Sequence, residues 1–103
     1  MPHPVTTVSS RVRLVEQHKT RLEVTRGPDV GLSLEIVGNS ARIGTAPEND
    51  LVLSDQTVSR QHCEIVPTPN GVRLRDEGST NGVVVGALWV RDATFAGQTQ
   101  IEL

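Results

Sequence analysis

The chain lacks the residues on which several kinds of protein depend. Its 103 residues include one cysteine, one tryptophan, one phenylalanine and no tyrosine. With Cys63 as the only cysteine, neither an intrachain disulfide nor a cysteine cluster for a metal can form. In a strand the adjacent side chains of His62 and Cys63 would point to opposite faces, which disfavours shared metal ligation. We therefore expect no metal site and no bound cofactor.

A strong charge of one sign is also missing. Ten basic and twelve acidic residues give a formal net charge of −2. No concentrated basic face is visible, which argues against a duplex-DNA or membrane-surface binder, and two aromatic residues are too few to stack single-stranded bases. Nine of the ten basic residues are arginine. This suits bidentate binding of phosphate or carboxylate, or reflects a genome that favours arginine codons.

Long hydrophobic runs are absent as well. No segment approaches the roughly 20 apolar residues that a membrane-spanning helix needs. Residues 1–10 contain no basic stretch followed by an apolar run, so they do not resemble a secretory signal. We expect a cytoplasmic protein that binds neither membrane nor nucleic acid directly.

Short alternating runs of aliphatic residues predict strands. The runs are three to six residues long, turn residues separate them about every ten positions, and Asn70-Gly71 is a strong hairpin signal. Two sheets that each bury one face against the other account for this pattern. We predict an all-β fold, an antiparallel β-sandwich with an aliphatic core. The runs are 22–24, 32–36, a short run that contains Ile43 and ends at Gly44, 51–53, 63–65, 72–74, 83–85, 88–90 and 101–103.

The first 18 residues differ in composition from the rest of the chain. They are rich in Pro, Ser, Thr and charged residues. We interpret residues 1–18 as a flexible tail or linker, with the alternative that 11–17 form a short strand or helical turn. Residues 19–103 are expected to be the folded domain.

Polar residues gather in three expected loops, at 42–53, 55–65 and 76–82. One interpretation makes Ser59 a nucleophile, His62 its base and Asp55 the orienting acid. The G-x-S-x-G elbow and the helix that should follow such a serine are missing, so we do not expect an enzyme. Instead, Ser59 would satisfy loop backbone, and a neutral His62 would be hydrogen-bonded beneath the loop.

The segment Gly78-Ser79-Thr80-Asn81-Gly82 would, taken alone, be a turn, because Asn-Gly pairs favour positive φ and hydroxyls bond local backbone. Its position about twenty residues after Ser-Arg-Gln-His is a rare combination. Together with IGTAPENDLVL, VSRQHCEI, LRDEGSTNG and the final IEL, it resembles the forkhead-associated (FHA) domains over residues 21–103.

The resemblance implies a β-sandwich of about eleven short strands whose loops at one end bind a phosphothreonine-containing protein or peptide. The loop sequence is also similar to FHA modules attached to bacterial enhancer-binding transcription activators. By this resemblance, Ser59 would hydrogen-bond the phosphate and Arg60 would add charge. Thr80 would line the phosphothreonine site, and Asn81 would bind the peptide main chain.

Four further residues would shape the loops. His62 matches the family's loop-bracing histidine, and Ser79 belongs to the turn itself. Gly44 and Gly82 would permit backbone conformations that a Cβ would resist.

Two positions depart from the family pattern. Thr45 stands where FHA domains usually place an arginine that contacts phosphate, although its hydroxyl remains a donor and Arg42 is a possible substitute. Gly86-Ala87 replaces the usual Asn-Gly. The departure at Thr45 keeps open a second hypothesis, a phosphate-independent interaction or oligomerisation module with a degenerate phosphate site.

Two features suggest contacts beyond the loops. Trp89 would face outward if Leu88 and Val90 point inward, and it would then cover a sheet edge or contact a partner. Thr6 and Thr7 lie in the expected tail; if a kinase modified either, the tail could fold back onto the domain's own loops. About fifteen residues extend to roughly 50 Å, which is long enough.

Overall fold

The computed structural model describes residues 10–16 and 20–103, and this part of the chain contains eleven strands and no helix. The strands are short because turn residues interrupt every aliphatic run. They are β1 (Arg11–Glu16), β2 (Thr20–Arg26), β3 (Ser33–Glu35), β4 (Ala41–Gly44), β5 (Leu51–Val52), β6 (Cys63–Thr68), β7 (Gly71–Asp76), β8 (Val83–Val85), β9 (Leu88–Val90), β10 (Asp92–Phe95) and β11 (Thr99–Glu102).

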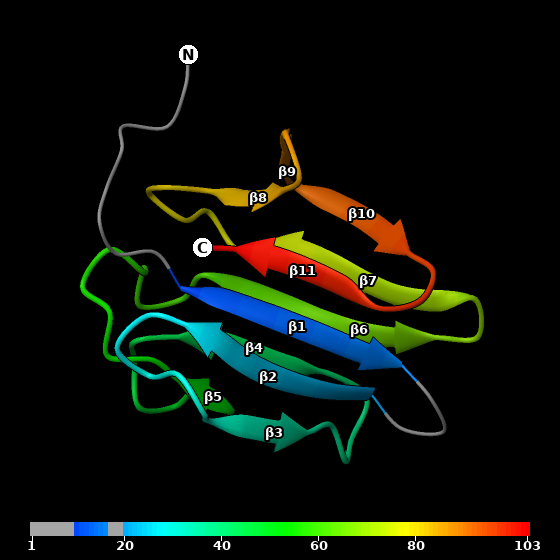
Figure 1. Ribbon diagram of the computed structural model, residues 1–103, viewed down its shortest axis with the longest axis horizontal. Coiled ribbons are helices and arrows are strands. Elements are labelled where there is room, and N and C mark those ends of the chain that lie inside the picture. Colours follow the sequence, from blue (N-terminus) through cyan, green and yellow to red (C-terminus); the bar gives the residue numbers. More distant parts are fainter. Residues whose placement is uncertain (1–9, 17–19) are drawn as a thin grey trace.

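The strands form two sheets that pack face to face. One has six strands in the order β3-β2-β1-β11-β8-β9, and the other has five in the order β10-β7-β6-β4-β5 (Figure 1). Paired strands run antiparallel except β4 and β5, which are parallel. The predicted β-sandwich is confirmed.

The core is aliphatic, as its composition predicts. Alternate residues of each strand point inward, and the register brings buried residues opposite one another, as with Leu14 and Leu22, or Ile65 and Leu74. Burying such a side chain stabilises the fold by about 1.5–3 kcal/mol. The largest fully buried apolar side chains are Leu14, Leu22, Ile43, Leu53, Ile65, Leu74 and Ile101.

The expected boundary between tail and domain at residue 18 is wrong for Arg11–Glu16. This segment is β1, which lies between β2 and β11 inside the six-stranded sheet, and Val12 and Leu14 are 0% exposed. The short-strand alternative was correct. Charged residues at the intervening positions gave the segment the composition of a linker, but in the sheet they lie near opposite charges, as Arg11 does near Glu102. Residues 1–9 and 17–19 lie outside the described residues.

The β8–β9 hairpin differs from expectation in one detail. Trp89 is exposed and Val90 is buried, as predicted, but Leu88 is 68% exposed and does not point into the core. β9 is the edge strand of its sheet and pairs with β8 alone, so one side of Leu88 has no strand beside it. The next strand, β10, was not among the expected runs.

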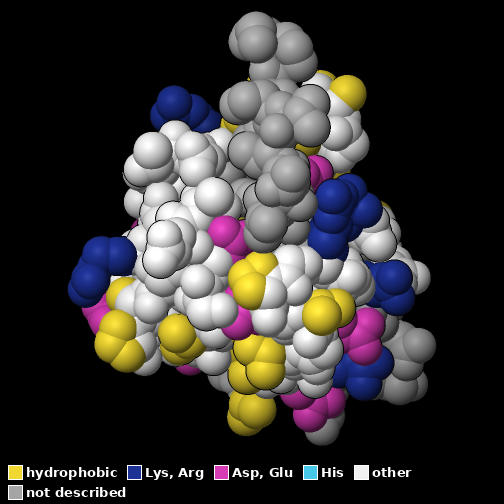
Figure 2. Space-filling model, turned by 60° about the vertical axis from the view of Figure 1, so that its left-hand side comes forward, with side chains coloured by type: hydrophobic (Ala, Val, Ile, Leu, Met, Phe, Trp, Pro, Cys, Tyr) yellow, Lys and Arg dark blue, Asp and Glu magenta, His cyan; other side chains and the backbone are white. Residues whose placement is uncertain are grey.

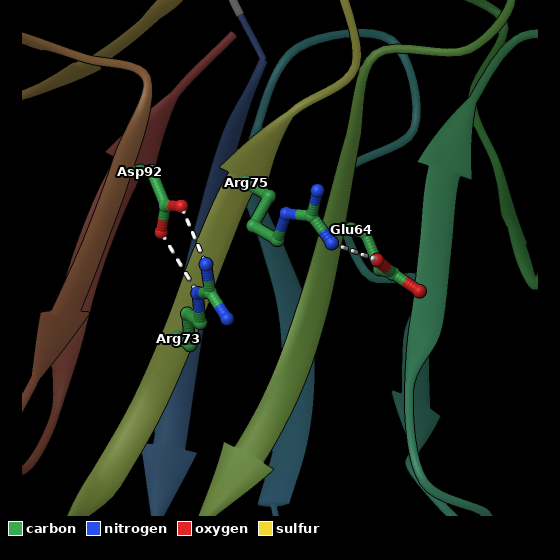
Figure 3. A network of polar contacts seen from close by, with 4 residues as sticks. All are labelled: Glu64, Arg73, Arg75 and Asp92. Atoms are coloured by element: carbon green, nitrogen blue, oxygen red, sulfur yellow. Dashed lines mark hydrogen bonds and ion pairs between the residues drawn. The ribbon is translucent and has the colours of Figure 1, made fainter.

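Charged side chains cover the outer face of the five-stranded sheet (Figure 3). Arg73 on β7 donates two hydrogen bonds to Asp92 on β10, at 2.9 and 2.6 Å, and Arg75 lies 3.9 Å from Glu64 on β6. The hydrogen bond from Arg73 lowers the pKa of Asp92. Both pairs lie on strands, away from the polar loops. The Arg73–Asp92 pair is exposed on both sides, and such pairs contribute little to stability.

Two further features of the described residues bear on function. They include no helix long and apolar enough to cross a membrane, and no group of three or more acidic, histidine or cysteine side chains among them is placed to hold a metal ion. Cys63 is buried, and burial raises the pKa of its thiol, so it is not poised to react.

Candidate functional site

The three polar loops predicted from the sequence meet at one end of the sandwich. They follow β4, β5 and β7, and the first residues of β1 lie at the same end (Figure 1). A shallow, open depression lies between these loops. It is lined by Thr45, Ser54, Gln56, Thr57, Val58, Ser59, Arg60, Gln61, Glu77, Gly78, Thr80 and Asn81.

Several direct hydrogen bonds join the loop after β5 to the loop after β7, and two of them involve predicted site residues. The Thr80 N–H donates to Oγ of Ser59 at 2.9 Å, and Nδ2 of Asn81 donates to the Thr57 carbonyl at 2.7 Å. Because Ser59 accepts through its oxygen, its hydroxyl hydrogen is available to a ligand. The second N–H of Asn81 is a further donor at the same place.

His62 lies beneath both loops and is 0% exposed. Its Nδ1 accepts a hydrogen bond from the Ser59 N–H at 3.0 Å, so the ring proton is on Nε2, which donates to the Gly82 carbonyl at 2.7 Å. Burial lowers the pKa of His62, against the opposing effects of the Gly82 carbonyl and Asp76. A neutral imidazole therefore connects the two loops.

The loop after β4 is held against the loop after β5. The Thr45 N–H donates to the Ser59 carbonyl and the Ala46 N–H to the Arg60 carbonyl, both at 3.1 Å. The backbone at Gly44 lies so close to the backbone at Arg60 that a Cβ on residue 44 would be 2.1 Å from the Arg60 carbonyl oxygen. Gly44 is thus required for space. Its φ is not in the left-handed region, so the expected reason, an unusual backbone conformation, does not apply.

The turn after β7 has its own internal bonds. The Ser79 N–H donates to Asp76, and Oγ of Ser79 accepts from the Gly82 N–H, each at 2.9 Å. Gly82 has a φ of 78°, where a side chain is strained, and a Cβ there would meet the Trp89 ring at 2.8 Å. Both the backbone and the ring therefore favour glycine.

Asp55 ties the start of the domain to the site. It is 4% exposed, accepts a hydrogen bond from Ser10 at 3.0 Å, and accepts two from Thr57. Burial alone would raise the pKa of Asp55, but the hydrogen bonds from Thr57 and Ser10 lower it. The loop that carries Ser59 is thus anchored to β1.

The arrangement is not that of a Ser-His-Asp triad. Asp55 bonds Thr57 and Ser10 rather than His62, and the histidine faces the backbone N–H of Ser59 rather than its hydroxyl. No proton path from the serine through the imidazole to the carboxylate is present in these contacts.

The structure brings together Thr45, Ser59, Arg60, Thr80 and Asn81 from the predicted set, all of which line the depression. Arg42 does not line it. This residue is on β4, where its backbone N–H and carbonyl bond the side chain and backbone of Asp50, so it does not occupy the place of the missing arginine.

Sequence reasoning missed several residues that build the site. Asn49 is buried, and its Nδ2 donates to the carbonyls of Arg60 and Ala46 at 2.7 and 2.9 Å. Asp55 was considered only as a catalytic acid, and Thr57 was not considered. An asparagine or aspartate in a polar loop commonly bonds backbone, but its long-range partner cannot be read from sequence.

Charge around the depression is mixed. Arg60 and Glu77 both line it, and Gln61 holds Glu48 at 3.1 Å nearby. In Figure 2, which brings this end of the molecule forward, uncharged side chains and backbone make up most of the visible face, basic and acidic side chains are scattered over it, and hydrophobic side chains gather in its lower part. Any anion bound here would depend mainly on hydroxyl, amide and backbone donors.

Comparison with known proteins identifies the family. Residues 23–103 match the family described as inner membrane component of T3SS, cytoplasmic domain. The FHA domain of CT664 from Chlamydia trachomatis shares this fold, with a TM-score of 0.64, 27% identity, and coverage of 92% of this chain and 95% of that one. The chain therefore belongs to the family described as inner membrane component of T3SS, cytoplasmic domain, and its fold is that of FHA domains.

Two further matches are similar to this chain, one in sequence and one in fold. The glycogen accumulation regulator GarA of Mycobacterium tuberculosis is 33% identical over 82 residues, which is 80% of this chain and 51% of GarA. A structure described as an analysis of phosphothreonine-dependent FHA domain interactions has a TM-score of 0.64 at 24% identity and covers 90% of this chain and 91% of that one. The chain spans about half the length, or less, of the curated relatives that it matches.

Proposed function

We propose that this FHA domain binds a phosphothreonine-containing segment of a partner protein in the depression between its loops. The main support is that Ser59, Thr80 and Asn81 line one depression and lie on two loops that hydrogen-bond each other. The phosphothreonine-dependent interactions studied for a domain of the same fold support this assignment.

The donors suit a phosphate. Phosphothreonine carries about −1.5 to −2 charge and three strong acceptor oxygens at neutral pH. The Ser59 hydroxyl, the Thr45 hydroxyl and the Arg60 guanidinium lie on the lining of one depression, and Asn81 supplies an amide for the peptide main chain. Because the loops are braced beforehand, little ordering is needed on binding, which favours affinity.

Preference for threonine over serine would rest on the extra methyl group. Its transfer from water contributes about 0.8 kcal/mol, or roughly fourfold. We expect selectivity of that size from the methyl alone, with any larger preference coming from the conformation of the bound peptide.

Thr45 favours a second function, a phosphate-independent interaction or oligomerisation module. An arginine hydrogen bond to a charged group contributes roughly 1.5–3 kcal/mol, and Arg42 does not line the depression. A site without this contact would bind phosphate on the order of ten- to a hundredfold more weakly.

The proposal extends to the larger protein. The name of GarA supports a regulatory role, and the resemblance of the loop sequence to modules of transcription activators supports placement in a cytoplasmic bacterial transcription regulator. A transcription reporter that responds equally to the wild-type domain and to Ser59→Ala would refute that extension.

The tail is a candidate ligand of the same site. Thr6 and Thr7 lie outside the described residues, but Ser10, three positions after Thr7, donates a hydrogen bond to Asp55, which lies between the lining residues Ser54 and Gln56. A synthetic tail peptide phosphorylated at either threonine should compete with other phosphopeptides. Failure to compete at millimolar concentration would refute self-binding.

The deciding experiment is fluorescence anisotropy with a degenerate phosphothreonine peptide library, with phosphoserine and unphosphorylated libraries as controls. We expect phosphate-dependent binding that Ser59→Ala weakens on the order of ten- to a hundredfold. Ser33→Ala, an exposed serine on β3, is the matched control and should bind as wild type. Binding that ignores phosphate, in folded protein, would establish the second function instead.

A further inference from the structure

Trp89 is a large apolar side chain that the functions above leave unused. It is on β9, directly opposite Val84 of β8, and its side chain is 57% exposed. An exposed tryptophan of this kind is enriched at binding surfaces, because the ring offers a large rigid contact area with a polar end.

The indole ring is continuous with the proposed phosphopeptide site. A Cβ built on Gly82 would lie 2.8 and 2.9 Å from ring atoms Cζ3 and Cε3, so the ring packs directly on the Gly82 backbone. Gly82 follows Asn81, which lines the depression, and adjacent Cα atoms are about 3.8 Å apart. The ring therefore begins about one residue beyond the edge of the depression.

A bound peptide would reach this ring. An extended chain advances about 3.3–3.6 Å per residue, so a segment whose phosphothreonine contacts Ser59 and whose main chain contacts Asn81 would bring a flanking side chain over the indole within a few residues. The backbone beneath the ring is held by the His62 side chain, whose Nε2 bonds the Gly82 carbonyl. The exposed indole ring is the apolar surface that a flanking side chain would meet.

We infer that Trp89 is a specificity-determining residue, which packs against an apolar side chain flanking the phosphothreonine in the same bound segment. This inference rests on the proposed phosphopeptide function and adds a sequence preference to it. Sequestering a leucine-sized side chain partly against the ring should favour an apolar residue over glycine at that position by roughly tenfold.

The test uses phosphothreonine peptide libraries in which each flanking position in turn is fixed as Leu or Gly. Wild-type protein should prefer Leu at one position by about tenfold. Trp89→Ala should lose that preference yet still distinguish phosphorylated from unphosphorylated peptide, and Trp89→Phe should retain most of it. Leu88→Ala is the matched control, because Leu88 is the adjacent exposed residue of the same strand and, by strand alternation, points away from Trp89.

Intrinsic fluorescence gives a second readout. Trp89 is the only tryptophan and the chain has no tyrosine, so emission reports this ring alone. Binding of the Leu-containing peptide should shift emission to shorter wavelength, and the Gly-containing peptide should shift it less. Unchanged selectivity in folded Trp89→Ala would overturn the inference alone. Absence of any phosphate-dependent binding by wild type would overturn both the inference and the proposed function.

Discussion

Replacing the buried imidazole of His62 by Ala should both destabilise the domain and abolish phosphopeptide binding. The side chain is 0% exposed and holds the Ser59 N–H at 3.0 Å and the Gly82 carbonyl at 2.7 Å. Its removal leaves a cavity and two backbone groups without their partner. Each unsatisfied group costs about 1–3 kcal/mol, and cavities of this kind cost a similar amount.

We therefore expect His62→Ala to lower the free energy of unfolding by at least about 3 kcal/mol, out of the roughly 5–15 kcal/mol typical of a domain. Thermal unfolding followed by circular dichroism should show a Tm lower by roughly 15–30 °C. Gln61→Ala is the control, because the adjacent Gln61 bonds only the exposed Glu48, and its Tm should change by only a few degrees. Equal Tm values for the two variants would refute the bracing role.

The same contacts predict a pH dependence. Nδ1 can accept the hydrogen bond from the Ser59 N–H only while the imidazole is neutral. Burial lowers the pKa of His62 in the folded state below the ordinary value of 6.5. Below about pH 6.5 the unfolded chain therefore binds more protons than the folded one, and the domain becomes less stable as the pH is lowered. The contribution is complete above pH 6.5 and is lost as pH falls through the folded pKa.

Because the chain has three histidines, the measurement is a comparison. Denaturant unfolding between pH 5 and pH 7.5 should show a steeper loss of stability for wild type than for His62→Gln, which cannot titrate at this position. Asp55, whose pKa is lowered from 3.8, titrates at lower pH and does not disturb the comparison. Parallel profiles for the two proteins would contradict the neutral-imidazole assignment.

Three further substitutions test the loops. Thr45→Arg should tighten phosphothreonine-peptide binding by roughly tenfold, because the gain from a charged hydrogen bond is larger than the cost of ordering the side chain. Thr45→Gln should not tighten binding. Equal affinities of the Thr45→Arg variant and the wild type in fluorescence anisotropy would refute this. Gly44→Ala should lower the free energy of unfolding by about 1–3 kcal/mol or more, because it forces a Cβ against the Arg60 carbonyl. Gly38→Ala is the control, because nothing lies within 4 Å of the added Cβ, and it should have the same free energy of unfolding as wild type. Asn81→Asp, which is isosteric but repels phosphate and cannot donate to the Thr57 carbonyl, should cost at least about tenfold in affinity and lower the Tm by a few degrees.

Much of the fold could be predicted because strand periodicity is written locally. Leu22 and Val24 alternate with charged residues, as do Val72 and Leu74, and this alternation already defines the buried face. All four side chains are buried in the structure. β1 was misassigned because its charged residues resemble a linker, and only its neighbours in the sheet make it a central strand. β10 was missed because its inward residues, Ala93 and Phe95, are only partly buried, which leaves a weak pattern.

The site was predictable in its residue types but not in its connections. Polar residues that interrupt aliphatic strands indicated the right three loops. The bond from Ser10 to Asp55 joins residues 45 positions apart, however, and no local pattern indicates such a contact. Likewise, whether Arg42 could replace the arginine missing at Thr45 depended on which way a strand presents its side chains, and β4 places Arg42 outside the depression lining.

The contacts of the loops indicate that positive charge, rather than the order of the loops, limits phosphopeptide affinity. Hydrogen bonds from Thr80 to Ser59 and from Asn81 to Thr57 exist in the free domain, so a ligand meets donors that are already in place and little ordering free energy is lost. Among the described residues that line the depression, Arg60 alone is an arginine or lysine. Affinity should therefore be limited by charge rather than by loop order. Adding a cation at Thr45 is then expected to tighten binding, whereas removing the brace at His62 is expected to abolish it.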